Sequence, residues 1–166
     1  MRALLVLLTF ACTVAAQQCP PGAAATKDGS RCFSLIPPKA DFITADRTCR
    51  MLGGNLASII NDADGMAIFL LLREKQQGGP IWIGGTDIFH YGNWTWTDGR
   101  PFKFLRGSEH YPEGAGKNCL TINNRSVWGR DDCCTEKPFL CATDLAAPKT
   151  SPQPTTESAI TTTPSN

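Results

Sequence analysis

The sequence predicts one small domain of the α+β class, in which two helices precede a series of short strands. Apolar residues recur at helical spacing in the first half of the chain, whereas from residue 81 onward short apolar or alternating runs are separated by turn residues. Eight cysteines among 166 residues indicate that disulfides hold the domain together.

The first helix is predicted from an apolar face and its boundary signals. Four apolar residues share that face: Phe42, Ala45, Cys49 and Leu52. Asp41 or Thr44 can cap the start of the helix, and Gly53 with Gly54 ends it. Because Cys49 lies on the apolar face, a disulfide there would tie the helix to the core.

The second helix is predicted to begin near Asn61, with Asp64 favouring its first turn. Three residues are expected to form its apolar stripe: Met66, Phe69 and Leu70. Arg73 and Lys75 lie near its end, and the Gly-Gly-Pro run at 78–80 stops it.

Short strands are predicted where apolar or alternating runs lie between turn residues. They cover five stretches: 81–85, 94–97, 119–122, 126–128 and 139–141. Between Gly99 and Asn118 the chain is rich in Gly and Pro and too long for a simple turn. A long loop of this kind in a small domain is usually functional.

The charge balance excludes some partners. The chain has 16 basic and 15 acidic residues, a net charge of +1, which argues against nucleic acid or an anionic membrane surface as the main partner. No apolar run reaches the length of about 18 residues that a membrane span needs, so membrane insertion is not expected.

The first 16 residues have the pattern of a secretory signal peptide. Arg2 supplies the positive start, an apolar stretch follows, and the small residues Val14 and Ala16 precede an expected cleavage site at Gln17. The alternative interpretation is a buried N-terminal helix. A signal peptide predicts a secreted, extracellular protein.

The last segment, residues 146–166, is predicted to be a disordered tail. Thr, Ser and Pro account for 13 of its 21 residues, and it has too little apolar surface to offset the entropy of ordering. An O-glycosylated stalk and a plain flexible tail both remain open. The domain is therefore expected to span residues 17–145.

Seven cysteines remain after removal of the signal peptide: Cys19, Cys32, Cys49, Cys119, Cys133, Cys134 and Cys141. An oxidising compartment makes disulfides the expected state of these side chains. A zinc site is disfavoured because the chain has only His90 and His110 and no paired CxxC motifs. Spacing alone does not choose among the connectivities.

Several stretches in a fixed order resemble a C-type-lectin-like domain. They are Cys19-Pro20, Ala45 with Cys49, Gly54 to Ile59, Trp82 to Gly85, Trp94 to Gly99, Asn118-Cys119, and Trp128 through Phe139 to Cys141. The resemblance covers nearly all of residues 19–141. It implies the C-type-lectin-like fold, with two helices flanking small antiparallel sheets and a long irregular loop that carries ligand binding.

The resemblance also implies a disulfide pattern. The implied pairs are Cys19-Cys32, Cys49-Cys141 and Cys119-Cys133. Cys134 is then left over. Its open interpretations are an intermolecular bridge that makes a disulfide-linked homodimer, a buried free thiol, and a register swap with Cys133.

Sugar-binding members of the family hold a calcium ion with oxygen ligands, and this sequence departs from their pattern. In place of the Glu-Pro-Asn or Gln-Pro-Asp triplet it has Tyr111-Pro112-Glu113 when aligned on proline, or Glu109-His110-Tyr111 when aligned on loop length. Of the first triplet, Glu113 keeps good oxygen ligands, whereas the Tyr111 phenol is a poor one.

The later ligands of that pattern are replaced by cations. Lys117 stands where a Glu is expected before Asn118 and Cys119, and Gly129 with Arg130 replaces Asn-Asp after Trp128. Cations beside a divalent ion are unfavourable. No metal cofactor is therefore expected at the usual sugar site, unless a register shift turns Asp131 or Asp132 inward.

Lys117 and Arg130 have three open interpretations. They form an ionic contact with Glu109 or Glu113 that pins the loop in place of the metal, they face an anionic ligand such as an acidic glycan, or they are solvated surface cations. The candidate ligand-binding set on the loop is therefore Glu109, Tyr111, Pro112, Glu113, Lys117, Asn118 and Arg130.

Aromatic residues and two glycosylation sequences complete the set of candidates. The four tryptophans are expected in the core, and the better sugar-stacking candidates are Phe102, Phe104 and Tyr111. Asn93 and Asn124 each begin an N-glycosylation sequence, Asn-Trp-Thr and Asn-Arg-Ser.

Two classes of function follow. The first is a secreted module that recognises a glycan or a cell-surface glycoconjugate, and the second is a calcium-independent protein-binding or structural member of the same fold. An enzyme is not expected, because the chain has no HExxH or G-x-S-x-G motif and only two histidines.

Overall fold

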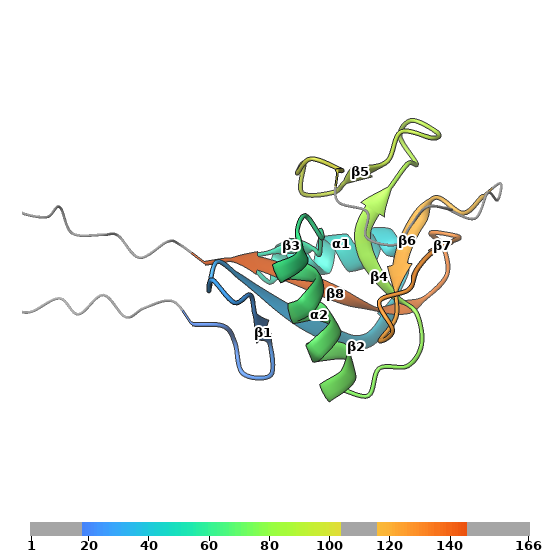
Figure 1. Ribbon diagram of the computed structural model, residues 1–166. Coiled ribbons are helices and arrows are strands. Elements are labelled where there is room, and N and C mark those ends of the chain that lie inside the picture. Colours follow the sequence, from blue (N-terminus) through green and yellow to red (C-terminus); the bar gives the residue numbers. More distant parts are fainter. Residues whose placement is uncertain (1–17, 104–115, 146–166) are drawn as a thin grey trace, which may run out of the picture.

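The computed structural model describes residues 18–103 and 116–145 (Figure 1). The elements follow the order β1 (Ala24–Ala25), β2 (Arg31–Ala40), α1 (Phe42–Met51), β3 (Asn55–Leu56), α2 (Asp62–Glu74), β4 (Ile81–Thr86), β5 (Thr95–Trp96), β6 (Cys119–Ile122), β7 (Trp128–Asp131) and β8 (Lys137–Asp144). The predicted α+β class is confirmed. The expected signal peptide and tail lie outside the described residues.

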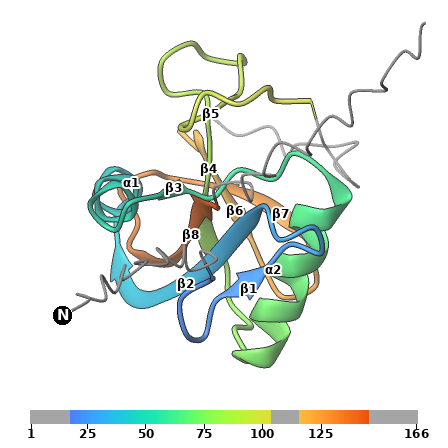
Figure 2. The same ribbon diagram turned by 90° about the vertical axis from the view of Figure 1, so that its left-hand side faces the viewer.

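The strands of the described ranges form one sheet in the order β1-β2-β8-β4-β6-β7, with β3 paired to β8 and β5 paired to β4. The pairings are antiparallel except for β4 with β8, which is parallel. Figure 2 shows α1 and α2 on opposite sides of this sheet. Neither helix is long and apolar enough to cross a membrane.

The longest strand, β2, is one that the sequence patterns did not predict. It pairs along most of its length with β8, and its register shifts between Ile36 and Ala40. Pro37 and Pro38 lie in that gap, and proline has no backbone N–H to donate to a ladder. The strand is thus held by β8, more than 90 residues later in the chain. A pairing over this distance cannot be predicted from a local sequence pattern.

Both helices begin at the predicted capping residues. The Asp41 side chain accepts a hydrogen bond from the backbone N–H of Thr44 at 2.9 Å. Asn61 does the same for Asp64, also at 2.9 Å. The prediction for Leu52 is wrong, because this residue is the C-cap of α1 and is 61% exposed.

The predicted apolar stripe of α2 is also wrong. The residues that α2 buries are Asp64, Ala67, Ile68, Leu71 and Leu72, whereas Met66 and Leu70 are more than half exposed. The helix is apolar around most of its circumference, so the sequence could not select the face that meets the sheet. Met66 and Phe69 instead line a surface pocket of about 380 Å³ with Ile122 and Trp128.

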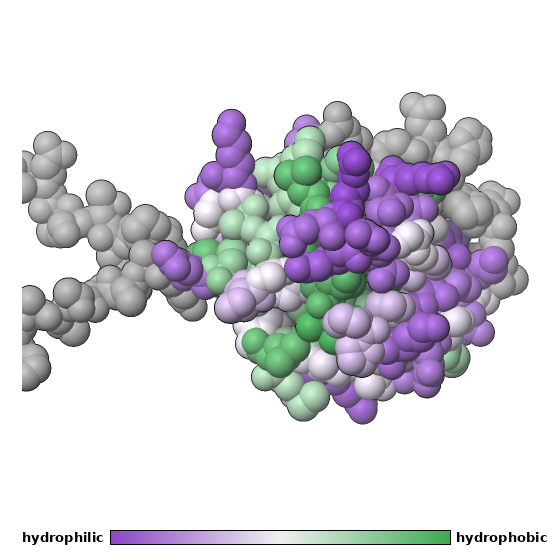
Figure 3. Space-filling model, turned by 90° about the horizontal axis from the view of Figure 1, so that it is seen from below, coloured by the Kyte–Doolittle hydropathy of each residue, from purple (hydrophilic) through white to green (hydrophobic). Residues whose placement is uncertain are grey.

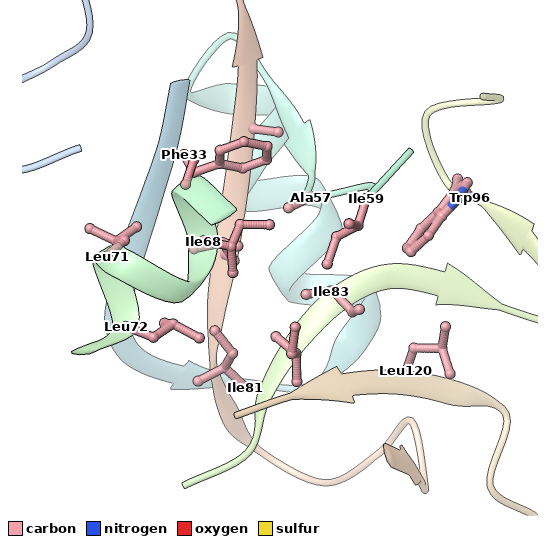
Figure 4. Packing of buried hydrophobic residues seen from close by; sticks show 14 residues of the cluster. Phe33, Ala57, Ile59, Ile68, Leu71, Leu72, Ile81, Ile83, Trp96 and Leu120 are labelled. Atoms are coloured by element: carbon pink, nitrogen blue, oxygen red, sulfur yellow. The ribbon is translucent and has the colours of Figure 1, made fainter. Parts of the chain in front are cut away.

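Two clusters of buried side chains lie on the two sides of the sheet. The cluster beneath α2 is drawn in Figure 4 and includes Phe33, Ile68, Leu71, Leu72, Ile81, Ile83, Trp96 and Leu120. The cluster beneath α1 contains Phe42 and Trp82, whose rings meet edge to face with centroids 5.7 Å apart. Figure 3 views the molecule from below and shows a largely hydrophilic face with a narrow band of hydrophobic residues.

Three disulfides cross-link the domain: Cys19–Cys32, Cys49–Cys141 and Cys119–Cys133. These are the pairs that the resemblance implies. The Cys49–Cys141 bridge joins α1 to β8, as expected from the position of Cys49 on the apolar face. Cys134 is a free and exposed thiol, which excludes the interpretation as a buried thiol and the swap with Cys133.

Gly84 allows β4 to pass close to the chain at β3. An added Cβ would lie 2.5 Å from the carbonyl oxygen of Leu56, and Gly84 N donates to Ala57 O at 2.8 Å. Gly84→Ala is expected to lower the free energy of unfolding by about 2 kcal/mol, because the added Cβ would push against the backbone of Leu56. Urea unfolding measures this loss. Gly78→Ala is the control, since its Cβ would meet nothing within 4 Å; equal losses in both variants would contradict the prediction.

Candidate functional site at the base of the long loop

The candidate site lies where the long loop leaves and re-enters the sheet. Its loop candidates Glu109, Tyr111, Pro112 and Glu113 lie outside the described residues, as does Phe104. Lys117, Asn118 and Arg130 are described, and they lie around the end of β4, the start of β6 and β7.

Asp87, directly after β4, is the centre of the described part of the site. Its side chain is fully buried and accepts hydrogen bonds from Asn118 Nδ2 at 2.8 Å and from the backbone N–H of Gly92 at 2.9 Å. The Arg130 guanidinium lies 3.8 Å from Asp87 Oδ2. The buried carboxylate is therefore compensated by a charge and by hydrogen bonds, as burial of a charge requires.

Arg130 is held from several sides. Its Nε donates to the carbonyl oxygen of Lys117 at 2.8 Å, and its guanidinium lies 4.8 Å from the centre of the Trp94 ring. The side chain is only 7% exposed. A planar guanidinium is suited to bind a carboxylate, a carbonyl and a ring at once. The interpretation of Arg130 as a solvated surface cation is therefore wrong.

Asn118 is fixed through both its side chain and its backbone. Its carbonyl oxygen accepts from the hydroxyl of Thr86 at 2.7 Å and from the backbone N–H of Asp87 at 3.2 Å. Lys117 beside it is exposed. The base of the loop thus combines a rigid polar junction with a cationic side chain that faces solvent.

The described donor set does not fit a calcium ion. No group of three or more His, Cys, Asp or Glu side chains able to hold a metal occurs in residues 18–103 and 116–145. Asp131 accepts from Lys137 Nζ at 2.7 Å, and that hydrogen bond lowers the pKa of Asp131. Asp132 caps the backbone N–H of Cys134 at 2.9 Å. Both carboxylates are therefore engaged in the turn between β7 and β8.

A second polar cluster, which the sequence patterns did not predict, lies where β2 and β8 meet α2. Arg31 Nη1 donates to Asp64 Oδ2 at 2.7 Å, and Arg31 Nη2 donates to Ser58 Oγ at 3.0 Å. Burial lowers the pKa of Arg31, and the charge of Asp64 opposes that shift. Arg100 and Asp144 extend the cluster with an ion pair of 2.6 Å. This cluster ties β2, α2 and β8 together.

The aromatic predictions are only partly confirmed. Trp82 and Trp96 are buried as expected, but Trp94 and Trp128 are half-buried. Phe102 packs against Trp96 with ring centroids 4.9 Å apart, so this side chain belongs to the edge of the core. The most exposed aromatic residues of the described chain are Phe89 and Tyr91, which no sequence pattern singled out.

The chain is similar in sequence to known proteins. The model of the family described as "Lectin C-type domain" matches residues 39–143. The galactose-specific lectin nattectin of Thalassophryne nattereri is 33% identical over 135 residues, which are 79% of this chain and 84% of nattectin.

Antifreeze proteins are also similar to this chain. A type-2 ice-structuring protein of Hemitripterus americanus is 29% identical over 131 residues, 76% of this chain and 77% of the relative. A solved structure of a calcium-independent type II antifreeze protein is 26% identical, with a TM-score of 0.65 over 77% of this chain and 95% of that one.

Proposed function

Because the chain belongs to the C-type lectin domain family, we propose that it is a secreted module that recognises a glycan or glycoconjugate without calcium. The observation that carries the proposal is the buried Arg130 guanidinium, paired with Asp87 and stacked on Trp94. It places a fixed cation at the base of the loop, where the family pattern has a ligand for a metal ion. The proposed activity is binding, not catalysis.

The proposed ligand-binding surface is the long loop with Lys117 and Asn118 at its base. Arg130 is buried in an ion pair with Asp87. Of the two cations that replace the family's oxygen ligands, Lys117 is therefore the one exposed to an approaching ligand. A galactoside is the first sugar to test, because the relative nattectin is named as galactose-specific. An acidic galactoside would add an attraction between its anion and the ammonium of Lys117.

Retention on a galactose matrix tests this proposal. The secreted protein is expected to bind equally in EDTA and in CaCl₂, because the cation at the loop base is part of the chain. For a sulfated galactoside, Lys117→Gln is expected to weaken binding by about threefold to tenfold, as the loss of one partly screened ion pair. Retention that appears only with calcium would overturn the proposal.

The second candidate function is a protein-binding or structural role with no sugar binding. The similarity to a type II antifreeze protein favours it, since that protein is described as calcium-independent and its printed description names no sugar. Absence of retention on a panel of neutral and acidic glycans, by a protein whose melting curve is cooperative, would favour this candidate over the first.

Cys134 is the proposed site of a covalent homodimer. Its thiol is exposed in the turn between β7 and β8, so two copies can approach it without unfolding. The non-reduced secreted protein is expected to have twice the monomer mass, and Cys134→Ser is expected to remain a monomer of unchanged melting temperature. Intact mass spectrometry checks both. A wild-type monomer that reacts with a thiol reagent would rule out this bridge.

A further inference from the structure

The turn between β4 and β5 places two exposed aromatic rings beside an exposed glycosylation sequence. Phe89 and Tyr91 are each 75% exposed. Asn93, two residues after Tyr91, begins the sequence Asn-Trp-Thr and is exposed as well. Figure 1 shows this turn projecting from the body of the sheet. Both rings are therefore open to contact by another group.

The backbone holds this turn without help from the rings. Asn93 N donates to the carbonyl oxygen of His90 at 2.9 Å, and Gly92 between them has a φ of +80°, which the third position of a type II turn requires. Gly92 N also donates to the buried Asp87 carboxylate at 2.9 Å. The position of Tyr91 relative to Asn93 is therefore set by backbone hydrogen bonds.

We propose that Asn93 carries an N-linked glycan and that the first sugar of this glycan packs on the Tyr91 ring. The side-chain amide of Asn93 makes no hydrogen bond to the described part of the chain, so it is available for the linkage. The inference rests on the secreted localisation proposed above, because N-glycans are added in the secretory pathway. It does not depend on which ligand the long loop binds.

The modification is a group transfer from a polyprenyl-diphosphate-linked oligosaccharide. A bond forms between C1 of the first N-acetylglucosamine and Nδ2 of Asn93. The C1–O bond to the diphosphate breaks, and the polyprenyl diphosphate leaves with the displaced amide proton. The asparagine side chain stays an amide, so no oxidant or reductant is needed.

The Tyr91 ring is within reach of that sugar. Two residues span at most about 7 Å, which is similar to the length of a tyrosine side chain. One face of a pyranose ring presents C–H groups, and a π-face attracts their positive edge as it does the edge of another ring. Stacking would remove both the ring and the sugar face from water.

The chain's own glycan explains the turn better than a membrane surface does. Residues 87–93 contain no Lys or Arg, whereas segments that bind membrane interfaces are rich in them. A glycan linked at Asn93 also stays at the turn, because the linkage is covalent. It would shield Phe89 and Tyr91 from association with other molecules.

The second glycosylation sequence is a matched control within the same chain. Asn124 lies in the turn between β6 and β7, and the residue two positions before it is Ile122, which is 2% exposed. No aromatic ring therefore precedes Asn124 at the spacing found at Asn93. A glycan at Asn124 is expected to add little to stability.

The test compares glycosylated and unglycosylated proteins secreted from mammalian cells. Glycopeptide mass spectrometry is expected to find a glycan at Asn93. The melting temperature of the wild type, trimmed enzymatically to one sugar, is expected to exceed that of Asn93→Gln by about 3–5 °C. In a Tyr91→Ser background the same comparison is expected to give a difference in melting temperature of about 1 °C or less. Asn124→Gln is expected to change the melting temperature of the wild type by no more than this.

Two results would overturn the inference. One is an unmodified Asn93 in a secreted protein, and the other is an equal gain in melting temperature with and without the Tyr91 ring. If the chain is not exported by its own first residues, the proposed secreted localisation is wrong, and not the inference about Asn93 and Tyr91. Expression behind a foreign signal peptide then still decides whether the glycan packs on Tyr91.

Discussion

Asp64→Asn is expected to lower the free energy of unfolding by about 3–5 kcal/mol, because it leaves a buried guanidinium without its main counter-charge. Asp64 is fully buried and Arg31 is 4% exposed. The Asp64 carboxylate accepts from Arg31 at 2.7 Å and from the backbone N–H of Ile60 at 3.0 Å. The amide of the variant keeps the shape of the side chain but removes its charge. Urea unfolding at neutral pH measures the loss.

A double variant separates the destabilisation caused by an unpaired buried charge from the net contribution of the Arg31–Asp64 pair to stability. Arg31→Met with Asp64→Leu is expected to be more stable than Asp64→Asn, because no uncompensated charge remains in the core. Glu74→Gln is the control, since its ion pair with Lys75 is exposed and is expected to contribute less than about 1 kcal/mol. A loss in Asp64→Asn no larger than in Glu74→Gln would show that water reaches Arg31.

Replacing both Cys49 and Cys141 by alanine is expected to cost about 4–5 kcal/mol. The bridge closes a loop with a sequence separation of 92 residues, and its loss frees the unfolded chain more than the loss of a short bridge does. Both cysteines are buried between α1 and β8, so the two missing sulfurs also leave unfilled space. Guanidinium unfolding of the purified double variant measures the loss.

The short N-terminal bridge is the matched control. Cys19 and Cys32 are separated by 13 residues, so their double alanine variant is expected to lose about 3 kcal/mol. The expected order of stability is wild type, then the short-bridge variant, then the long-bridge variant. The reverse order would show that native packing, not the length of the loop, decides the contribution of each bridge.

Features that depend on neighbours in the chain were predictable. Asp41 and Asn61 cap their helices through residues three positions later, and β4 and β6 follow runs of apolar residues bounded by turns. The departure from the calcium pattern was visible in Lys117 and Arg130 for the same reason. Each of these conclusions needs only the identity of residues within a few positions.

Features that depend on distant partners could not be predicted from the sequence. The strand β2 exists because β8 pairs with it, and α2 turns Ile68 and not Met66 inward because of where β1 and β2 lie. At the site, the sequence singled out Arg130 and left open a contact with Glu109 or Glu113, which lie outside the described residues. Its described carboxylate partner is Asp87, a residue 43 positions earlier in the chain.

By itself, then, the order of residues determined the α+β class, the helix caps and the loss of the oxygen ligands, because short-range geometry and side-chain chemistry are written in adjacent positions. Only the tertiary structure decided which faces are buried and which charges meet. A buried ion needs its counter-ion within a few ångströms, and only the folded sheet brings the end of β4 to Arg130 and Asp64 to Arg31.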